Sequence, residues 1–568
     1  MLSRRRFVSI ALGTTALGGC GISGAIRPGP PAVLSGVPID AHMHLFNGAD
    51  VPVIGWLTQV DFTAETGGSL PDITKSPLIR LIVSFLASVT PTAGQELQRL
   101  PQRLPRPDAP RMRSAGVDRL AGFLERYQAA VLVGADDAGV MDLLPADSPD
   151  RQQRLTEDRQ LFADLAAAAG VPPAEVLAEP LVADDAPSIA RAPMRRAPPQ
   201  PMPAPTARRI AEGLFDPQKQ RGDPLEQTLA GMIQWAELMT RPRAQIVQQA
   251  VSLYGRQDEV RVFCNHLLDL GRWLRADEVR QSDPDDLIAL FAQISARRRD
   301  VLILNFVGFC PLRAAIEGEA VHRRVQDAVE RQGFAGIKLY PPMGFRPLLN
   351  LDVGFGHVRP QNRPAGGGAA LDRELRRLYG WCQDNDVPIA AHASASMGAG
   401  PGTAEYSAPW LWRPVLREFP GLRVNLAHFG GFGGHGNPQW EDQLIAMLDA
   451  FANLYFDTGF WTEAMAGART RPAALAQTRR LFAQEPLAGR RMLYGSDWSM
   501  IARLESHPAY LAGLQGFVGT LVGQDRAATQ AIMGENARRW LGLDRDGRQR
   551  RRLARFHGSH PVWERLAG

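Results

Sequence analysis

The segment Ile39-Asp40-Ala41-His42-Met43-His44 places two histidines one residue apart near the start of the chain. The apolar residues around this segment predict a β-strand over residues 37–45. Side chains two residues apart in a strand point to the same face, so His42 and His44 would project side by side. Two imidazoles that reach one point can bind a metal ion, although a single His-x-His pair also arises by chance. The meaning of this segment therefore depends on the rest of the chain.

Seven further short apolar runs follow, and each is succeeded by residues with helical spacing. The runs predict strands over residues 260–268, 300–309, 334–341, 387–393, 422–428, 453–459 and 491–497. Together with the first run they make eight strands that alternate with helices. This alternation is typical of an α/β protein with a (β/α)8 TIM barrel.

The alternation is interrupted between the first and second strands. Residues 56–255 show helical spacing in several places, and the prolines that crowd together over 187–205 predict a mobile loop. We therefore expect a large, mostly helical insertion inside a barrel built from residues 37–55 and 256–545. A separate domain is the alternative, but no series of strands supports it. A basic tail over residues 546–568 follows the barrel, and its arginines are expected on a solvated face.

Residues 1–36 have the features of an export signal followed by a tether. A basic head, Arg4-Arg5-Arg6, precedes an apolar run over residues 10–17 and then Gly18-Gly19-Cys20. The head resembles a twin-arginine signal, and the residues before Cys20 resemble a bacterial lipobox, in which this cysteine is lipidated. We expect export to the bacterial cell envelope, into the periplasm, with an N-terminal lipid anchor in the membrane. A plain cleaved signal peptide is the alternative.

The composition and the charge indicate which class of molecule the protein binds. The chain has 568 residues, a hydrophobic fraction of 45% and a formal charge of +5, which suit a globular protein with a large core. No nucleic-acid motif accompanies the arginine-rich patches, so a small-molecule substrate is expected rather than a nucleic acid. The remaining cysteines, Cys264, Cys310 and Cys382, lack zinc-motif spacing and predict no disulfide framework. The sequence carries no signal for an oligomeric state.

Polar residues recur at the ends of the predicted strands. His392 ends the fifth strand, His428 the sixth and Asp497 the eighth, while Lys338 lies in the fourth. In a barrel of this type the C-terminal strand ends meet at one mouth, where active sites form. One buried histidine is usually a packed core residue, but four histidines and an aspartate at equivalent strand ends are hard to explain that way. Imidazole and carboxylate groups suit Zn2+ and similar ions.

The ordered set of histidines and aspartate resembles the amidohydrolase superfamily. Four segments resemble, more closely, the branch that contains amidohydrolase-related metal hydrolases and aminocarboxymuconate-semialdehyde decarboxylase. They are Gly336-Ile337-Lys338-Leu339, Leu426-Ala427-His428-Phe429-Gly430-Gly431, Tyr494-Gly495-Ser496-Asp497-Trp498 and Gly534-Glu535-Asn536-Ala537-Arg538-Arg539. The resemblance covers about residues 37–55 and 256–545 and leaves the insertion and the tail without a counterpart.

The resemblance implies a role for each strand-end residue. His42, His44, His392 and Asp497 would hold a divalent metal, Zn2+ in the first instance, with one ion expected and two as the alternative. Asp497 would also take a proton from water and return it to the leaving group. His428 would bind a second ion, polarise the substrate or move a proton. Lys338 would be either carboxylated and bridging, or, as we favour, an unmodified lysine that binds substrate or is structural.

Three functions remain open at this stage. The first is a metal-dependent hydrolase that cleaves an amide, ester or lactone bond, which the export signal favours. The second is a nonoxidative decarboxylase of an unsaturated or aromatic acid, which needs a cation for the carboxylate, with Arg346 and Arg413 as candidates. The third is a non-catalytic metal-binding lipoprotein, which the intact set of ligands argues against. The weaker candidates for pocket residues are His266, His357, His435, Trp410, Trp461 and Trp498.

Overall fold

The computed structural model describes the chain in fifteen segments. They are residues 36–52, 55–56, 59–60, 77–102, 104, 109–133, 151–177, 201–216, 224–254, 260–274, 281–431, 440–465, 468–503, 507–544 and 546–567. The export signal, Cys20, His435 and most of the proline-rich loop therefore lie outside the described residues. The chain forms two compact units, one with residues 1–70, 91–107 and 242–568, the other with residues 71–90 and 108–241.

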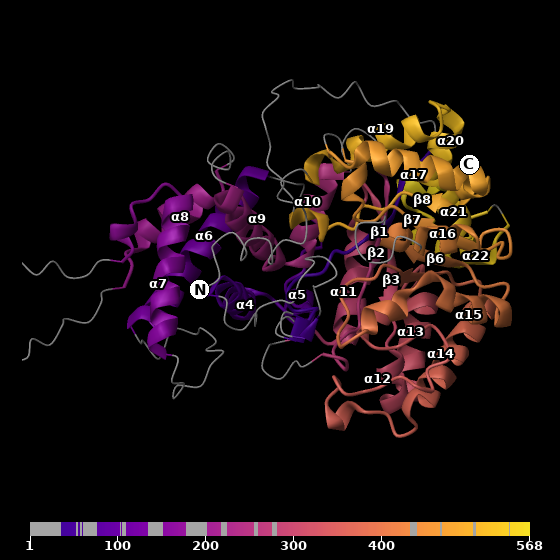
Figure 1. The fold of residues 1–568 in the computed structure, drawn as a ribbon, viewed down its shortest axis with the longest axis horizontal. Helices are drawn as coiled ribbons and strands as arrows, with labels where there is room; N and C mark the ends of the chain where they lie inside the picture. Colours follow the sequence, from indigo (N-terminus) through magenta and orange to yellow (C-terminus); the bar gives the residue numbers. More distant parts are fainter. Residues whose placement is uncertain are drawn as a thin grey trace, which may run out of the picture. The chain divides into compact units, whose positions relative to one another are not determined.

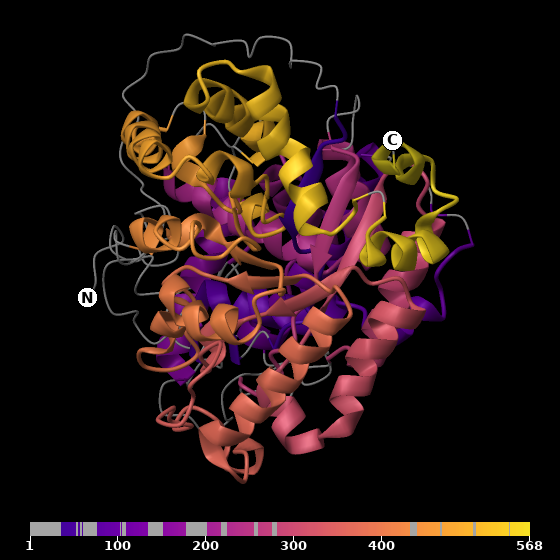
Figure 2. The same cartoon turned by 90° about the vertical axis from the view of Figure 1, so that its right-hand side faces the viewer.

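The first unit is a barrel of eight parallel strands in sequence order. The strands are β1 (Ile39–Met43), β2 (Val262–His266), β3 (Leu302–Gly308), β4 (Gly336–Leu339), β5 (Ile389–His392), β6 (Val424–Ala427), β7 (Leu454–Asp457) and β8 (Met492–Leu493). Each lies inside the run of sequence that predicted it. The predicted (β/α)8 barrel is thus confirmed, and the helices that follow the strands lie outside them (Figures 1 and 2).

Backbone hydrogen bonds from the last strand and its loop to the first bring the ends of the sheet together. The amide of Ala41 donates to the carbonyl of Tyr494 at 2.8 Å, and the amide of Asp497 donates to the carbonyl of His42 at 2.8 Å. Met43 and Trp498 form a parallel bridge just beyond these bonds. The same pairing that closes the sheet therefore sets Asp497 beside the two histidines of β1.

The helices of the barrel follow their strands with breaks that the sequence pattern did not predict. After β2 comes α11 (Pro284–Arg297), and after β3 come α12 (Pro311–Glu317) and α13 (Glu319–Arg331). Gly318 separates these two with φ +66° and ψ −133°, a backbone conformation that glycine adopts much more readily than residues with a side chain. The later helices are α14 (Gly367–Asp384), α15 (Arg413–Glu418), α16 (Trp440–Ile445), α17 (Arg471–Gln484), α18 (Ala488–Arg491), α19 (Tyr510–Leu521), α20 (Arg526–Gln530) and α21 (Asn536–Trp540).

The C-terminal residues expected as a basic tail form two helices, α22 (Arg548–His557) and α23 (Pro561–Ala567). Leu553, Val562 and Trp563 belong to one apolar cluster with residues of β1 to β3 such as Ile39 and Leu302. The arginines of α22 are divided between environments, because Arg552 is buried and Arg548, Arg551 and Arg555 are exposed. This segment is therefore part of the packed barrel.

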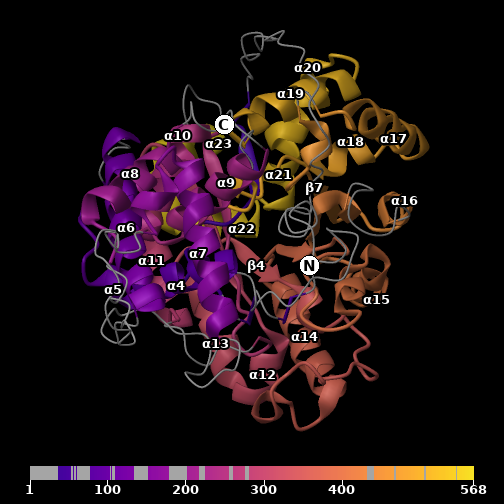
Figure 3. The same ribbon diagram turned by 60° about the vertical axis from the view of Figure 1, so that its left-hand side comes forward.

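The second unit is helical in the residues described. It contains α4 (Pro77–Val89), α6 (Ala109–Gln128), α7 (Arg151–Ala168), α8 (Ala204–Leu214) and α9 (Pro224–Met239), which lie side by side in Figures 1 and 3. Phe85, Phe123, Tyr127 and Phe162 form a chain of aromatic contacts with ring centroids 4.8–6.2 Å apart. The chain breaks between α9 and the next helix, α10 (Arg243–Tyr254). Pro242 accounts for this break, because it has no amide hydrogen to continue a helix.

No helix among the described residues is both long enough and apolar enough to span a membrane.

A buried cluster of charges ties the segment after β1 to α5 (Ala93–Leu97) and to the start of α10. The guanidinium of Arg243, which is fully buried, donates from Nε to Asp50 Oδ2 at 2.9 Å and forms an ion pair with Glu96. The backbone amide of Arg243 donates to Glu96 Oε2 at 2.8 Å, and Nη2 donates to Ser282 Oγ at 2.6 Å. Burial raises the pKa of Glu96 to about 7, although Arg243 opposes that shift. Arg243 is thus the cation that makes two buried carboxylates tolerable.

Replacing Arg243 by Met would leave Asp50 and Glu96 without their cation. We expect the free energy of unfolding to fall by about 3–5 kcal/mol, as measured by denaturant titration. The matched control is Arg331→Met, because Arg331 pairs with Asp327 at 3.3 Å with 77% of its side chain exposed. That change should cost less than about 0.5 kcal/mol. Equal effects of the two substitutions would contradict the role assigned to Arg243.

Candidate metal centre

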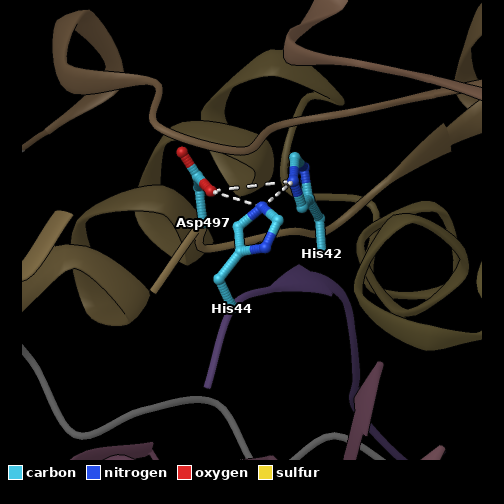
Figure 4. A group of neighbouring side chains, drawn as sticks. All are labelled: His42, His44 and Asp497. Atoms are coloured by element: carbon cyan, nitrogen blue, oxygen red, sulfur yellow. Dashed lines mark hydrogen bonds and ion pairs between the residues drawn. The ribbon is translucent and has the colours of Figure 1, made fainter. Parts of the chain in front are cut away.

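Two imidazole nitrogens and one carboxylate oxygen converge at the C-terminal ends of β1 and β8. His42 Nε2 lies 3.3 Å from His44 Nε2, and Asp497 Oδ1 lies 3.6 Å from the first and 3.5 Å from the second (Figure 4). All three residues are buried, and the Asp497 side chain keeps 9% exposure. Three donor atoms thus face one another without an apolar group between them.

The orientation of both imidazoles is fixed through their other nitrogens. His42 Nδ1 lies 3.2 Å from Asp457 Oδ1, and His44 Nδ1 lies 2.7 Å from the backbone carbonyl of His266. Carboxylate and carbonyl oxygens only accept, so both Nδ1 atoms must carry the hydrogen. The lone pair of each ring is then on Nε2, which is the atom that faces Asp497. Histidines that bind metals commonly have such a partner for the second nitrogen.

Asp457, the last residue of β7, organises more of this site than His42 alone. Its carboxylate accepts from Asn425 Nδ2 at 2.7 Å, from the amide of His428 at 3.0 Å and from the amide of Gly459 at 2.9 Å. The residue is fully buried. Asp457 is not among the residues predicted from the sequence, although an acidic residue at the end of an apolar strand is the same signal that singled out Asp497.

His428 and Lys338 lie beside the three converging residues. The ring centroid of His428 is 4.9 Å from that of His42, and its Nδ1 lies 2.9 Å from the carbonyl of Gly459. Lys338 Nζ lies 3.3 Å from His42 Nε2. A second grouping of possible ligands among the described residues joins His42 and His428 with Asp457. The two groupings share His42, so they describe alternative uses of the same imidazole.

His392 stands next to this centre but outside both groupings. Its ring centroid is 4.6 Å from that of His428, while its Nε2 lies 3.0 Å from Ser394 Oγ and 3.1 Å from Ser396 Oγ. The tyrosine that follows β4, Tyr340, packs on the other side of the ring, with centroids 4.7 Å apart. The structure therefore brings His392 to the site but turns Nε2 onto two serine hydroxyls.

The electrostatics of the centre favour neutral imidazoles. Burial lowers the pKa values of His42, His44 and His392 well below the usual range, and the nearby Lys338 ammonium lowers them further. Burial also lowers the pKa of Lys338 to about 8, against the opposing effect of Asp457 and Asp497. The neutral imidazole is the form that binds a metal ion, so the rings are held in the protonation state that binding requires.

The backbone is strained where two of these side chains leave the sheet. Asp497 has φ +54° and His428 has φ +68°, both in the left-handed region that residues with a side chain rarely adopt. Such conformations cost of order 1–3 kcal/mol each and cluster at functional sites. The hydrogen bonds of His428 to Asp457 and Gly459 help to hold that strained backbone in place.

The weaker candidates lie in different places. His266 is fully buried, with its ring stacked on that of His42 at 4.8 Å. His357 stacks on Trp273 at 6.0 Å, and its Nε2 lies 2.9 Å from the carbonyl of Met343. Trp461 and Trp498 are buried, and Trp410 packs edge-on against Trp440 at 5.4 Å.

Of the two arginines suggested for a substrate carboxylate, Arg346 has its described contacts away from the centre. Arg346 forms an ion pair with Asp352 at 2.6 Å, and Arg413, at the start of α15, is exposed. Among the described residues, Lys338 is the cationic side chain that lies beside His42.

Comparison with known proteins gives a family match and several similar solved structures. Residues 267–543 match the family model Amidohydro_2, described as Amidohydrolase. None of the curated proteins matches the chain.

Three solved structures illustrate the similarity. The first, 5-carboxyvanillate decarboxylase from Sphingomonas paucimobilis, is 14% identical with a TM-score of 0.31, over 50% of this chain and 79% of that one. An amidohydrolase from Burkholderia multivorans with bound zinc is 13% identical with a TM-score of 0.33, over 52% and 87%. A 5-carboxyvanillate decarboxylase from Novosphingobium aromaticivorans with manganese is 13% identical with a TM-score of 0.35, over 59% and 90%.

The matched segment contains β3 to β8 of the barrel and the residues Lys338, His392, His428, Asp457 and Asp497. The two histidines of β1 precede it in sequence and meet it in space at Asp497. The segment over residues 267–543, which is just under half of the chain, thus matches the amidohydrolase family, and with the barrel and the converging donors it supports an enzyme that uses a divalent metal.

Proposed function

We propose that the protein is a hydrolase that cleaves an amide, ester or lactone bond of a small molecule at the centre formed by His42, His44 and Asp497. The observation that carries the proposal is the mutual spacing of their donor atoms, 3.3–3.6 Å. Donors about 2.0–2.1 Å from a tetrahedral zinc ion lie about 3.3–3.4 Å from one another. The residues therefore fit a Zn2+ ion without rearrangement of these three side chains.

His392 is the fourth proposed ligand. Its ring already lies against His428, but its Nε2 contacts the hydroxyls of Ser394 and Ser396. To bind the ion, the imidazole must leave these hydroxyls, which can in turn pair with each other because their oxygens are 2.8 Å apart. A divalent ion at this centre supplies Lewis-acid chemistry that lowers the pKa of water and polarises a carbonyl group.

The protein residues then handle the protons and the substrate. Asp497 has the carboxylate that takes a proton from the attacking water and returns it to the leaving group, since it is the one acidic residue of the ligand set and its side chain keeps 9% exposure. His428, held by Gly459 through Nδ1, is placed to polarise the substrate carbonyl or to pass a proton on. We propose that Lys338 is unmodified and donates to an oxygen of the substrate.

A nonoxidative decarboxylase is the second candidate, and Lys338 is the observation that favours it. A buried ammonium beside the donors could hold the carboxylate of an unsaturated or aromatic acid. Hydrolysis and decarboxylation are distinguished by their products. The metal-loaded enzyme is tested with lactones, esters and amides for release of acid, and with aromatic carboxylic acids for release of carbon dioxide.

We also propose that the protein is exported to the cell envelope and anchored there through a lipid on Cys20. The residues that support this proposal are the basic head and the apolar run that precede Cys20 in the sequence.

The metal centre is tested with His42→Ala and Asp497→Ala. We expect each variant to fold, to lose the metal that wild type holds at about one ion per chain, and to lose activity. The measurements are metal analysis of the purified protein and the product assays above. His322→Ala is the matched control, because His322 is a buried histidine that pairs with Glu374 at 2.9 Å, outside the centre. Activity that survives in the metal-free variants would refute the assignment.

The orienting role of Asp457 is tested with Asp457→Asn. The amide can present its NH2 group to His42, which favours the imidazole tautomer with its hydrogen on Nε2, where the ion must bind. Loss of such an orienting carboxylate commonly weakens metal binding by about 10–100-fold. Titration calorimetry with Zn2+ measures the change, and Asp442→Asn, at a surface ion pair with Arg480, provides the control. An unchanged affinity would show that Asp457 does not orient the ligand.

The anchor is tested with Cys20→Ser in cells that express the full chain. Without the thiol no lipid can be attached, so we expect the protein to move from the membrane fraction to the soluble fraction. Fractionation followed by detection of the protein measures the shift. Membrane association that is unchanged in the variant would argue against a lipid on Cys20.

A further inference from the structure

His266, the last residue of β2, lies against the metal centre but has no role in the scheme above. Its ring stacks on His42 with centroids 4.8 Å apart and planes inclined by 28°, and it meets His44 edge-on at 5.9 Å. On its other side the ring packs edge-on against Phe306 at 4.7 Å. The imidazole therefore fills the space between the two β1 histidines and the apolar core of the barrel.

Both ring nitrogens of His266 are buried, and neither has a hydrogen-bond partner among the described residues. Buried histidines away from the centre are different. His322 uses a ring nitrogen toward Glu374, His557 toward the carbonyl of Gly333, and His560 toward the carbonyl of Arg298. A buried polar group without a partner is unfavourable and calls for an explanation such as a bound ion or water.

Packing alone does not require an imidazole at this position. The residue beside His266 in the β2–β3 register is Phe306, and an aromatic ring without nitrogens would fill the same space. The hydrogen bond that orients His44 is accepted by the backbone carbonyl of residue 266, so any residue at this position could accept it. The feature that remains unexplained is the pair of nitrogens.

We propose that His266 is a further residue of the metal site. His266 lies outside both groupings of possible ligands, so its imidazole serves the ion held by His42, His44 and Asp497 through a water molecule in the coordination shell of the ion. The inference rests on the proposed metal centre and adds His266, supplied by β2, to the three histidines proposed as ligands. In this role the unpaired nitrogens are kept free of protein partners because the loaded site uses them.

The test is His266→Phe, with Co2+ as the probe. The variant keeps the ring packing against Phe306 and the backbone bond to His44, and it removes only the nitrogens. We expect Co2+ to bind about 10–100-fold more weakly by titration and the visible absorption spectrum of bound Co2+ to change. The metal-free variant should unfold at a temperature no lower than wild type, because two unsatisfied buried nitrogens are gone. A residue that only packs would leave Co2+ affinity and spectrum unchanged.

Two further variants keep the test decisive. His557→Phe, a buried histidine that bonds to Gly333, should leave Co2+ binding as in wild type. If His266→Phe does not fold, His266→Gln replaces it and should also weaken binding and alter the spectrum. Wild-type affinity and spectrum in a folded His266 variant would overturn this inference alone. Failure of wild type itself to bind Co2+ would instead overturn the proposed metal centre, and this inference with it.

Discussion

The hydrogen bond between Asp457 and His42 is the interaction on which the rest of the site depends. It joins β7 to β1, the two strands on either side of β8, and decides which nitrogen of His42 faces Asp497. The same carboxylate holds the side chain of Asn425 and the backbone of His428, so three strands share one buried anion. Because the residue is fully buried, these bonds form in surroundings where an unpaired carboxylate would be costly. The geometry of the donors is therefore built into the core rather than left to mobile loops.

The hydrogen bonds that close the barrel also bring the residues of the site together. The amide of Asp497 bonds to the carbonyl of His42, so the bond that brings β8 to β1 also delivers the carboxylate to the histidines. The strained backbone lies at Asp497 and His428, which have positive φ values at the points where the chain leaves the strands. A loss of pairing between β1 and β8 would separate the donors as well as open the sheet. For this reason, changes that destabilise the barrel should also weaken metal binding.

The barrel also accommodates an insertion of helices between its first two strands. The residues that lead away from β1 and those that lead back toward β2 meet at the buried Arg243, which pairs with Asp50 and Glu96. This network lies within the barrel unit and uses a cation to hold two segments distant in sequence. The second unit has its own aromatic core and its own buried ion pairs around Glu237. Each unit thus contains buried ion pairs of its own.

The sequence by itself determined the fold class, because eight apolar runs followed by helical spacing have few other arrangements. It also pointed to His42, His44, Lys338, His392, His428 and Asp497, since polar residues at strand ends are visible as breaks in apolar runs. It could not show that Asp457 orients His42, that His392 turns Nε2 onto Ser394 and Ser396, or that His266 lacks a partner. These facts depend on distances between residues up to several hundred positions apart. Only the closed barrel sets those distances, because it brings the ends of separate strands to one place.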